Sequence, residues 1–284
     1  DLCLSLDKEP GPTALAMRVD ARERRGIGLS PHGATYPLNA ECAAYFLLGL
    51  DDDAKFRGNT KGYPQLLYEA VGLPWRGQRY TLHPGATARQ RAAAAWAALG
   101  VRGDEVVIGL NTGAGSVFAN KTWPPERFIE LARALRTRHP WRVALLGGPD
   151  ERERNRRIAS ACPGVLDTGT DHDEATFTAL VGRCNGGGSG LARGGRCGGA
   201  AWGRWGATWR PSSHQEIELY GHGTKLVTQL GCAPCYRRQC ERSPTCMDDI
   251  ALAPVLRAVE HWAGAVREDQ SRPAVALPVL AIGG

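Results

Sequence analysis

Short apolar runs alternate with amphipathic segments between residues 87 and 184. In the segment that starts at Pro125, for example, Phe128, Leu131 and Leu135 recur at spacings of three and four and so lie on one helical face. Strands that alternate with helices through short loops are typical of a parallel sheet covered on both faces. The predicted strands are 105–110, 142–146 and 165–167, and the predicted helices are 87–99, 125–138, 150–161 and 171–182.

The flanking regions follow this pattern less regularly. The first hundred residues form a second α/β region, with predicted strands at 2–6 and 26–29 and predicted helices at 13–19 and 62–71. Residues 186–210 contain ten glycines and no Val, Ile or Phe, so they are not expected to supply a central strand. A further amphipathic helix is predicted at 249–262, and residues 263–284 are expected to be weakly ordered.

Composition narrows the class of protein. At 284 residues the chain is long enough for two domains, and 43% hydrophobic with 23% charged residues excludes a disordered or collagen-like chain. A net charge of +6 is compatible with an anionic partner without selecting one. The longest apolar stretch, 92–99, is too short to cross a membrane. Nine cysteines without an export signal indicate reduced thiols or metal ligands rather than disulfides. These features predict a cytoplasmic protein.

Two segments carry candidate phosphate and sugar contacts. The loop Asn111–Ser116 follows a strand and contains two glycines, so its backbone N–H groups could hold a diphosphate, with Lys121 supplying a cation. The alternatives are a plain glycine turn and a solvated lysine. Glu151 or Glu153, after the next strand, could accept hydrogen bonds from a ribose, although acidic residues at a helix start also complement the helix dipole.

A late group of thiols offers a different chemistry. Four cysteines lie within fifteen residues, with three arginines among them. Four thiolates can bind tetrahedral zinc, so a metal-binding or small nucleic-acid-binding module is one interpretation, and unligated structural thiols are the other. The cysteines are Cys232, Cys235, Cys240 and Cys246.

Five segments, taken in order along the chain, carry a resemblance to a known family: Leu6–Pro10, Ile108–Phe128, Leu145–Arg154, Ser213–Gly221 and Cys232–Cys240. They resemble the heptosyltransferases of glycosyltransferase family 9, which assemble the lipopolysaccharide core. The resemblance implies an α/β fold of the GT-B type, with two Rossmann-like lobes of which the N-terminal one is incomplete here. It divides the chain into an acceptor-side lobe at 1–100, a donor lobe at 101–265 and a tail at 266–284.

The resemblance also implies partners and roles. The donor is ADP-heptose, and the acceptor is a lipid-A-linked core oligosaccharide, which implies peripheral contact with the inner membrane; no cofactor and no nucleic acid are expected. Thr112, Gly113 and Lys121 match the phosphate-side loop, and Glu151 matches the ribose-binding acid, with Glu153 as the alternative register. A transferase that uses another sugar nucleotide is the related alternative.

Two departures from the family pattern set further expectations. The catalytic base of the family lies on a loop that is expected upstream of Asp1, so its counterpart is unknown and the chain as given is expected to show no turnover. Residues 186–210 diverge from the family's Val-rich strand and donor-contacting turn, and their Gly, Arg, Trp and Ala content suits a GC-rich gene read in another frame. The donor lobe is therefore expected to lack one strand.

Overall fold

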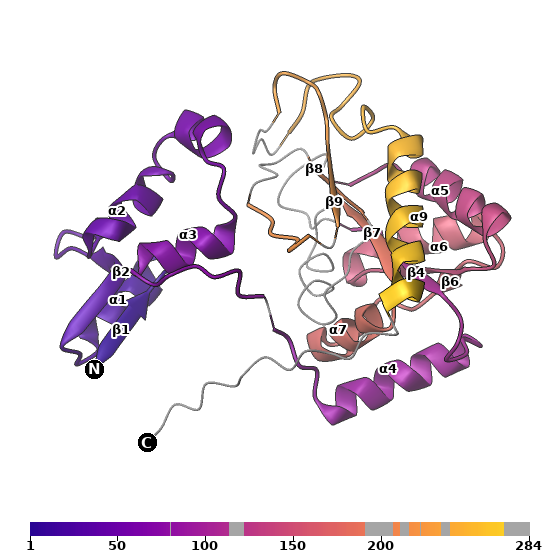
Figure 1. Ribbon diagram of the computed structural model, residues 1–284, viewed down its shortest axis with the longest axis horizontal. Helices are drawn as coiled ribbons and strands as arrows, with labels where there is room; N and C mark the ends of the chain where they lie inside the picture. The colour runs from indigo at the N-terminus through magenta and orange to yellow at the C-terminus, as the bar shows by residue number, and fades with distance from the viewer. Residues whose placement is uncertain are drawn as a thin grey trace.

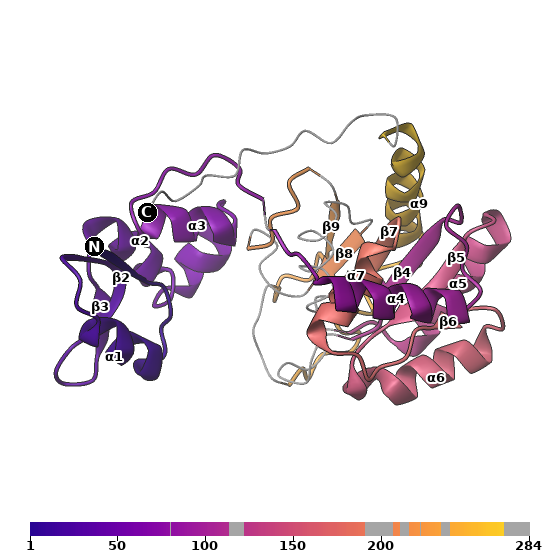
Figure 2. The ribbon, with the colours of Figure 1, turned by 90° about the horizontal axis from the view of Figure 1, so that it is seen from below.

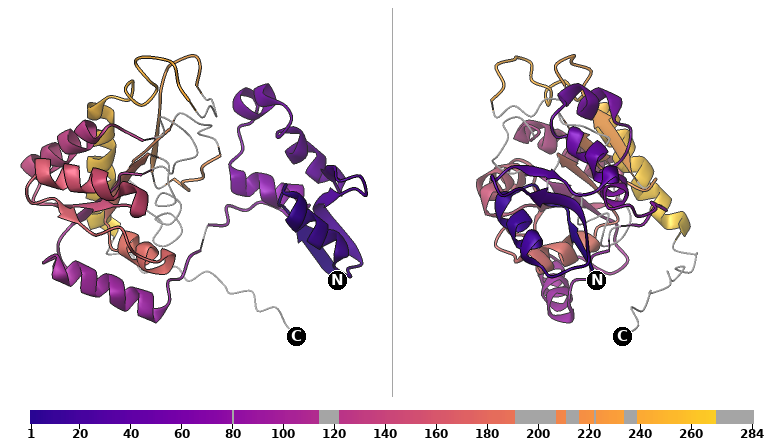
Figure 3. Two further views of the ribbon diagram at one scale, coloured as in Figure 1. Left: turned by 180° about the vertical axis from the view of Figure 1, so that it is seen from behind. Right: turned by 90° about the vertical axis from the view of Figure 1, so that its left-hand side faces the viewer.

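The chain forms two β-sheets, each with its own helices (Figure 1). The computed structural model describes residues 1–79, 81–113, 122–190, 207–210, 216–221, 223–233 and 239–269. The first sheet has three strands in the order β1-β2-β3, and the second has six in the order β6-β5-β4-β7-β8-β9. The connection from α3 to α4, which is visible in both views of Figure 3, contains no helix or strand among its described residues.

The first sheet lies in the N-terminal part of the chain. β1 pairs in parallel with β2, and β3 pairs with β2 in antiparallel fashion. One helix of this unit, α2, was not predicted, yet its Cys42 and Tyr45 pack with Ile27 and Leu66 to form the core of the unit. The elements are β1 (Leu2–Ser5), α1 (Pro10–Arg18), β2 (Glu23–Leu29), β3 (Thr35–Pro37), α2 (Ala40–Leu47), the π-helical turn η1 (Ala54–Gly58) and α3 (Tyr63–Ala70).

The second sheet is parallel throughout, as the alternation of strands and helices predicts. The predicted strands and helices between 87 and 184 are confirmed to within a few residues at their ends. The strands are β4 (Val107–Asn111), β5 (Arg142–Leu146), β6 (Leu166–Asp167), β7 (Gly186–Gly190), β8 (Ala207–Arg210) and β9 (Thr224–Val227). The helices are α4 (Ala86–Ala98), α5 (Pro125–Arg138), the 3-10 turn η2 (Pro149–Glu151), α6 (Arg152–Ala161), α7 (Glu174–Gly182) and α9 (Leu252–Asp269).

Helices cover both faces of this sheet, because successive strand residues point to opposite sides. Ile108 and Leu110 of β4 pack in the core under α5, α6 and α9. Val107 of the same strand faces the other way and packs with α4 and α7. Figure 2 shows α4 and α7 together on that second face.

Helix α4 makes its contacts with the second sheet. Trp96 is buried against Val107 and Leu180, and Arg91 forms an ion pair with Asp173 at 2.8 Å (Nη1 to Oδ2). The predicted domain boundary at residue 100 would place α4 in the first lobe, and that division stays a prediction. The packing of Trp96 nevertheless assigns α4 to the core of the second unit.

The prediction that residues 186–210 supply no strand is wrong at both ends of this segment. β7 lies between β4 and β8, and residues 191–206 lie outside the described residues. Asn185 sets the register: its N–H donates to the Val107 carbonyl at 2.8 Å, and its Oδ1 accepts the Val107 N–H at 2.9 Å. A glycine run joins the sheet here because the ladder needs only backbone N–H and C=O groups, which hydrophobic periodicity does not report.

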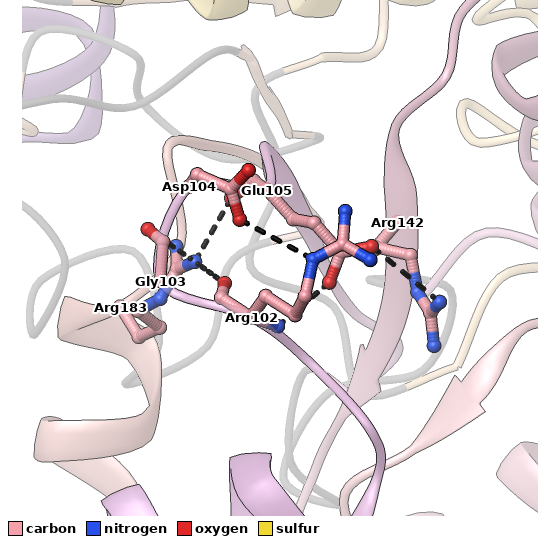
Figure 4. Close-up of polar contacts among 6 residues, drawn as sticks. All are labelled: Arg102, Gly103, Asp104, Glu105, Arg142 and Arg183. Carbon is pink, nitrogen blue, oxygen red and sulfur yellow. Dashed lines mark hydrogen bonds and ion pairs between the residues drawn. The ribbon is translucent and has the colours of Figure 1, made fainter.

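Arg183 joins the amino end of β4 to the end of α7 (Figure 4). Its Nη2 donates to the carbonyls of Arg102, Gly103 and Glu105 at 2.8, 3.2 and 2.9 Å. The Glu105 carboxylate in turn accepts the Arg102 N–H at 2.7 Å and lies 3.6 Å from Arg142. One guanidinium thus satisfies three carbonyls of the turn that leads into the central strand.

Replacing Arg183 tests this arrangement. Arg183→Ala is expected to lower the free energy of unfolding by about 1–3 kcal/mol, because three carbonyls lose a charged donor. Arg183→Lys is expected to restore little, since a single ammonium nitrogen cannot hold these carbonyls and also replace Nη1, which donates to Asn185 Oδ1 at 3.1 Å. Arg102→Ala is the matched control: its ion pair with Asp104 is exposed, so a change within about 0.5 kcal/mol is expected. Urea unfolding measures all three, and equal losses for Arg183→Ala and Arg102→Ala would contradict the assignment.

Candidate functional site

The candidate site lies where the strand order of the second sheet reverses. The chain runs from β4 outward to β5 and β6, and then returns to β7 on the other side of β4. The strand order thus reverses between β4 and β7, and such a switch point is where parallel α/β sheets bind ligands. The predicted loop begins there, at the residues after Asn111.

Thr112 is fully buried at this switch point. Its N–H donates to the Leu146 carbonyl at 3.2 Å, which extends the pairing of β4 with β5 by one residue. Its hydroxyl donates to Oδ1 of Asn155, so the side chain points into the protein. A contact with a ligand at this turn is therefore left to the backbone.

Gly113 presents that backbone. Its carbonyl accepts a hydrogen bond from Asn111 Nδ2 at 3.2 Å. Within the described part of the chain, its N–H has no acceptor. An unpaired N–H at the switch point is a donor available to an anion.

Glu151 packs against Gly113 and Gly147, the glycines that follow β4 and β5. A β-carbon at Gly113 would lie 2.1 Å from Oε1 of Glu151, and one at Gly147 would lie 2.7 Å from the Glu151 β-carbon. Oε2 of the same carboxylate accepts the Gly148 N–H at 2.8 Å. Both glycines are thus required for Glu151 to reach the turn after β4.

The structure separates the two predicted carboxylates. Glu153 has a side chain that is 82% exposed and forms an ion pair with Arg156 at 2.6 Å, whereas Glu151 is half-buried beside Gly113. Thr112, Gly113 and Glu151 are therefore brought together, and Glu153 is not. Lys121 lies outside the described residues.

The cysteine group is only partly described. Cys232 is exposed, Cys240 is half-buried and Cys246 packs in the main core, while Cys235 lies outside the described residues. Among the described residues, no three His, Cys, Asp or Glu side chains are grouped so that they could hold a metal ion.

A second polar cluster, in the first unit, was not singled out from the sequence. Lys8 Nζ lies 4.6 Å from the ring centroid of Tyr45, and Lys55 pairs with Glu216 at 3.7 Å. Burial, and then the charge of Lys55, lowers the pKa of Lys8, while Cys42 and Glu216 oppose this shift. The only sequence signal was the resemblance at Leu6–Pro10 and Ser213–Gly221, because the contacting residues are scattered along the chain.

The close packing at Gly113 yields a prediction. Gly113→Ala is expected to lower the free energy of unfolding by about 1–3 kcal/mol, because the new β-carbon overlaps the Glu151 carboxylate. Adding Glu151→Ala removes that overlap, so the double variant should be more stable than Gly113→Ala alone. Gly11→Ala is the control, since no atom lies within 4 Å of its added β-carbon. Additive losses in chemical denaturation would contradict the packing described here.

A family model matches the part of the chain that contains this site. Residues 39–172 match the family model described as "Glycosyltransferase family 9 (heptosyltransferase)", a stretch that includes both the turn after β4 and Glu151. No curated protein sequence matches the chain.

Two solved structures share the fold. A family 9 glycosyl transferase from Veillonella parvula DSM 2008 is 18% identical, with a TM-score of 0.65 over 93% of this chain and 74% of that one. The ADP-heptose LPS heptosyltransferase II of E. coli is 17% identical, with a TM-score of 0.63 over 94% of this chain and 77% of that one. The predicted α/β, two-lobed GT-B type fold is confirmed. Residues 39–172 are thus similar to glycosyltransferase family 9, and the chain shares the fold of that family's solved structures.

Proposed function

We propose that this glycosyltransferase uses ADP-heptose as donor and transfers heptose to the lipopolysaccharide inner core with inversion at the anomeric carbon. The observation that carries the donor half is that the Gly113 backbone and the Glu151 carboxylate lie next to each other at the switch point of the sheet. A nucleoside diphosphate carries both complementary groups: phosphate oxygens accept from an N–H, and ribose hydroxyls donate to a carboxylate.

Each residue has a defined role in this proposal. The Gly113 N–H donates to the diphosphate, Glu151 accepts from the ribose, and the ammonium group of Lys121 neutralises the charge that develops on the leaving ADP. The acceptor hydroxyl oxygen forms a bond to the anomeric carbon while the bond from that carbon to the diphosphate oxygen breaks. The hydroxyl proton passes to a carboxylate base, for which no residue of this chain is assigned.

The acceptor is the second part of the proposal. The E. coli structure that shares the fold is named as an ADP-heptose LPS heptosyltransferase, which supports this donor and this class of acceptor. Within the described ranges, no helix is both long enough and apolar enough to cross a bilayer. We infer peripheral contact with the inner membrane on the cytoplasmic side, where the net charge of +6 would favour anionic lipid.

Nucleotide binding tests the donor half without requiring turnover. Isothermal titration calorimetry with ADP is expected to show one site, and Glu151→Gln should raise the dissociation constant about tenfold or more, because a charged acceptor is lost. Glu153→Gln is the matched control and should bind like the wild type, since Glu153 faces solvent. Absence of ADP binding would overturn the proposal. Tighter binding of UDP or GDP would show that the donor carries that nucleotide and not ADP.

Lys121 gives a separate prediction. Lys121→Met is expected to weaken ADP binding several-fold while leaving adenosine binding unchanged, because only the diphosphate carries the negative charge. The ADP effect should shrink as salt is added. Equal losses for ADP and adenosine in the same titrations would contradict a diphosphate contact.

A further inference from the structure

Asn155 is a fully buried amide in the first turn of α6, next to the turn after β4. Its Oδ1 accepts the hydroxyl hydrogen of Thr112. Its Nδ2, about 3.3 Å from where a β-carbon at Gly147 would stand, has no acceptor among the described residues. A buried amide whose NH2 group has no acceptor lowers the stability of the fold. The hydrogen bond between Thr112 and Asn155 Oδ1 therefore points to a role other than stability.

Arg154, the neighbouring residue of α6, holds the backbone of the same turn. Its Nη1 donates to the Thr112 carbonyl at 2.9 Å. Together with the Leu146 carbonyl and Asn155, this contact ties every polar group of Thr112 to the β5–α6 segment. Thr112, which precedes Gly113, is therefore held at its N–H, its side chain and its carbonyl.

The orientation of the Gly113 N–H follows from these bonds. In a trans peptide the C=O of one residue and the N–H of the next point in opposite directions. Because Arg154 draws the Thr112 carbonyl toward α6, the Gly113 N–H points away from α6. It is thus aimed away from the helix, and it has no acceptor among the residues that the structure describes.

We propose that Arg154 and Asn155 are positioning residues that hold the Thr112–Gly113 peptide in the orientation that binds the donor diphosphate. The inference rests on the proposed function, because it names the residues that prepare that same site. Asn155 acts through the Thr112 hydroxyl, and Arg154 acts through the Thr112 carbonyl. Neither needs to touch the nucleotide.

Titration with ADP tests this proposal when it is paired with a matched control. Thr112→Val and Asn155→Ala remove the same hydrogen bond, so each should raise the ADP dissociation constant about tenfold, and the double variant should be no worse than the weaker-binding single one. Thr112→Ser keeps the hydroxyl and should bind ADP within about twofold of the wild type. Thr168→Val is the control: this buried threonine, at the carboxyl end of β6, donates to the Leu145 carbonyl at 2.8 Å. It should lower the melting temperature without changing ADP affinity.

Arg154→Ala separates positioning from direct charge contact. A positioning role predicts that its fold-change in ADP dissociation constant stays the same as salt is raised, whereas a guanidinium in contact with phosphate would lose its effect. If Asn155→Ala does not fold, the nearly isosteric Thr112→Val carries the test.

The outcomes distinguish the two proposals. Wild-type protein that fails to bind ADP overturns the proposed function, and the positioning role with it. Wild-type binding with unchanged affinity in Thr112→Val and Asn155→Ala overturns the positioning role alone. Equal weakening by Thr168→Val also overturns it, because the effect would then be a general loosening of the sheet edge. An Arg154→Ala effect that vanishes at high salt overturns the role of Arg154.

Discussion

The pairing of β4 on both of its edges is the constraint on which the second unit depends. β5 and β7 run parallel to β4 on its two sides, and every residue of β4 is buried. With helices packed on both faces, the strand has no free direction in which to move. The residues that directly follow it, Thr112 and Gly113, therefore start from a fixed point, which is what a site that must present a single N–H requires.

The two ends of β4 differ in how completely their polar groups are satisfied. At the amino end, Arg183 and Asn185 supply donors and acceptors to the incoming turn and to the first strand residue. At the carboxyl end, the Gly113 N–H and the Asn155 Nδ2 have no acceptor in the described part of the chain. The polar groups at the amino end are thus satisfied within the protein, whereas two donors at the carboxyl end have no partner in the described residues, which is what the proposed donor site requires.

Much of this fold could be predicted because its periodicity is strong. The strand predicted at 142–146 has those same bounds in the structure, and Phe128, Leu131 and Leu135 are buried on one face of α5 as predicted. β7 could not be predicted, since glycines carry no hydrophobic signal and the strand is held by backbone pairing that begins at Asn185. α2 was missed for a related reason: only two of its eight residues are buried, so its pattern is faint.

The site could be predicted only in part. The glycines that follow one strand predicted Thr112 and Gly113. The acidic residues that follow the next strand predicted either Glu151 or Glu153. Sequence spacing could not choose between the two acids, because the choice depends on which side chain packs over Gly113 and Gly147. Asn155 gave no signal, and Arg154 only ended the segment Leu145–Arg154 that carries the resemblance, with no role assigned to it. Their role depends on a bond between residues about forty positions apart, which appears only once β4 and α6 are side by side.

The segment Glu216–Gly221, between β8 and β9 in the sequence, contacts residues of the N-terminal part of the chain. The Tyr63 N–H donates to the Glu216 carbonyl at 3.1 Å, Lys55 pairs with the Glu216 carboxylate, and the rings of Trp75 and Tyr220 lie 6.4 Å apart between centroids. The described residues of this segment thus contact the first unit through a main-chain hydrogen bond, an ion pair and an aromatic contact. A change in the position of Glu216–Gly221 would therefore be felt at α3, because the Tyr63 N–H is held by the Glu216 carbonyl.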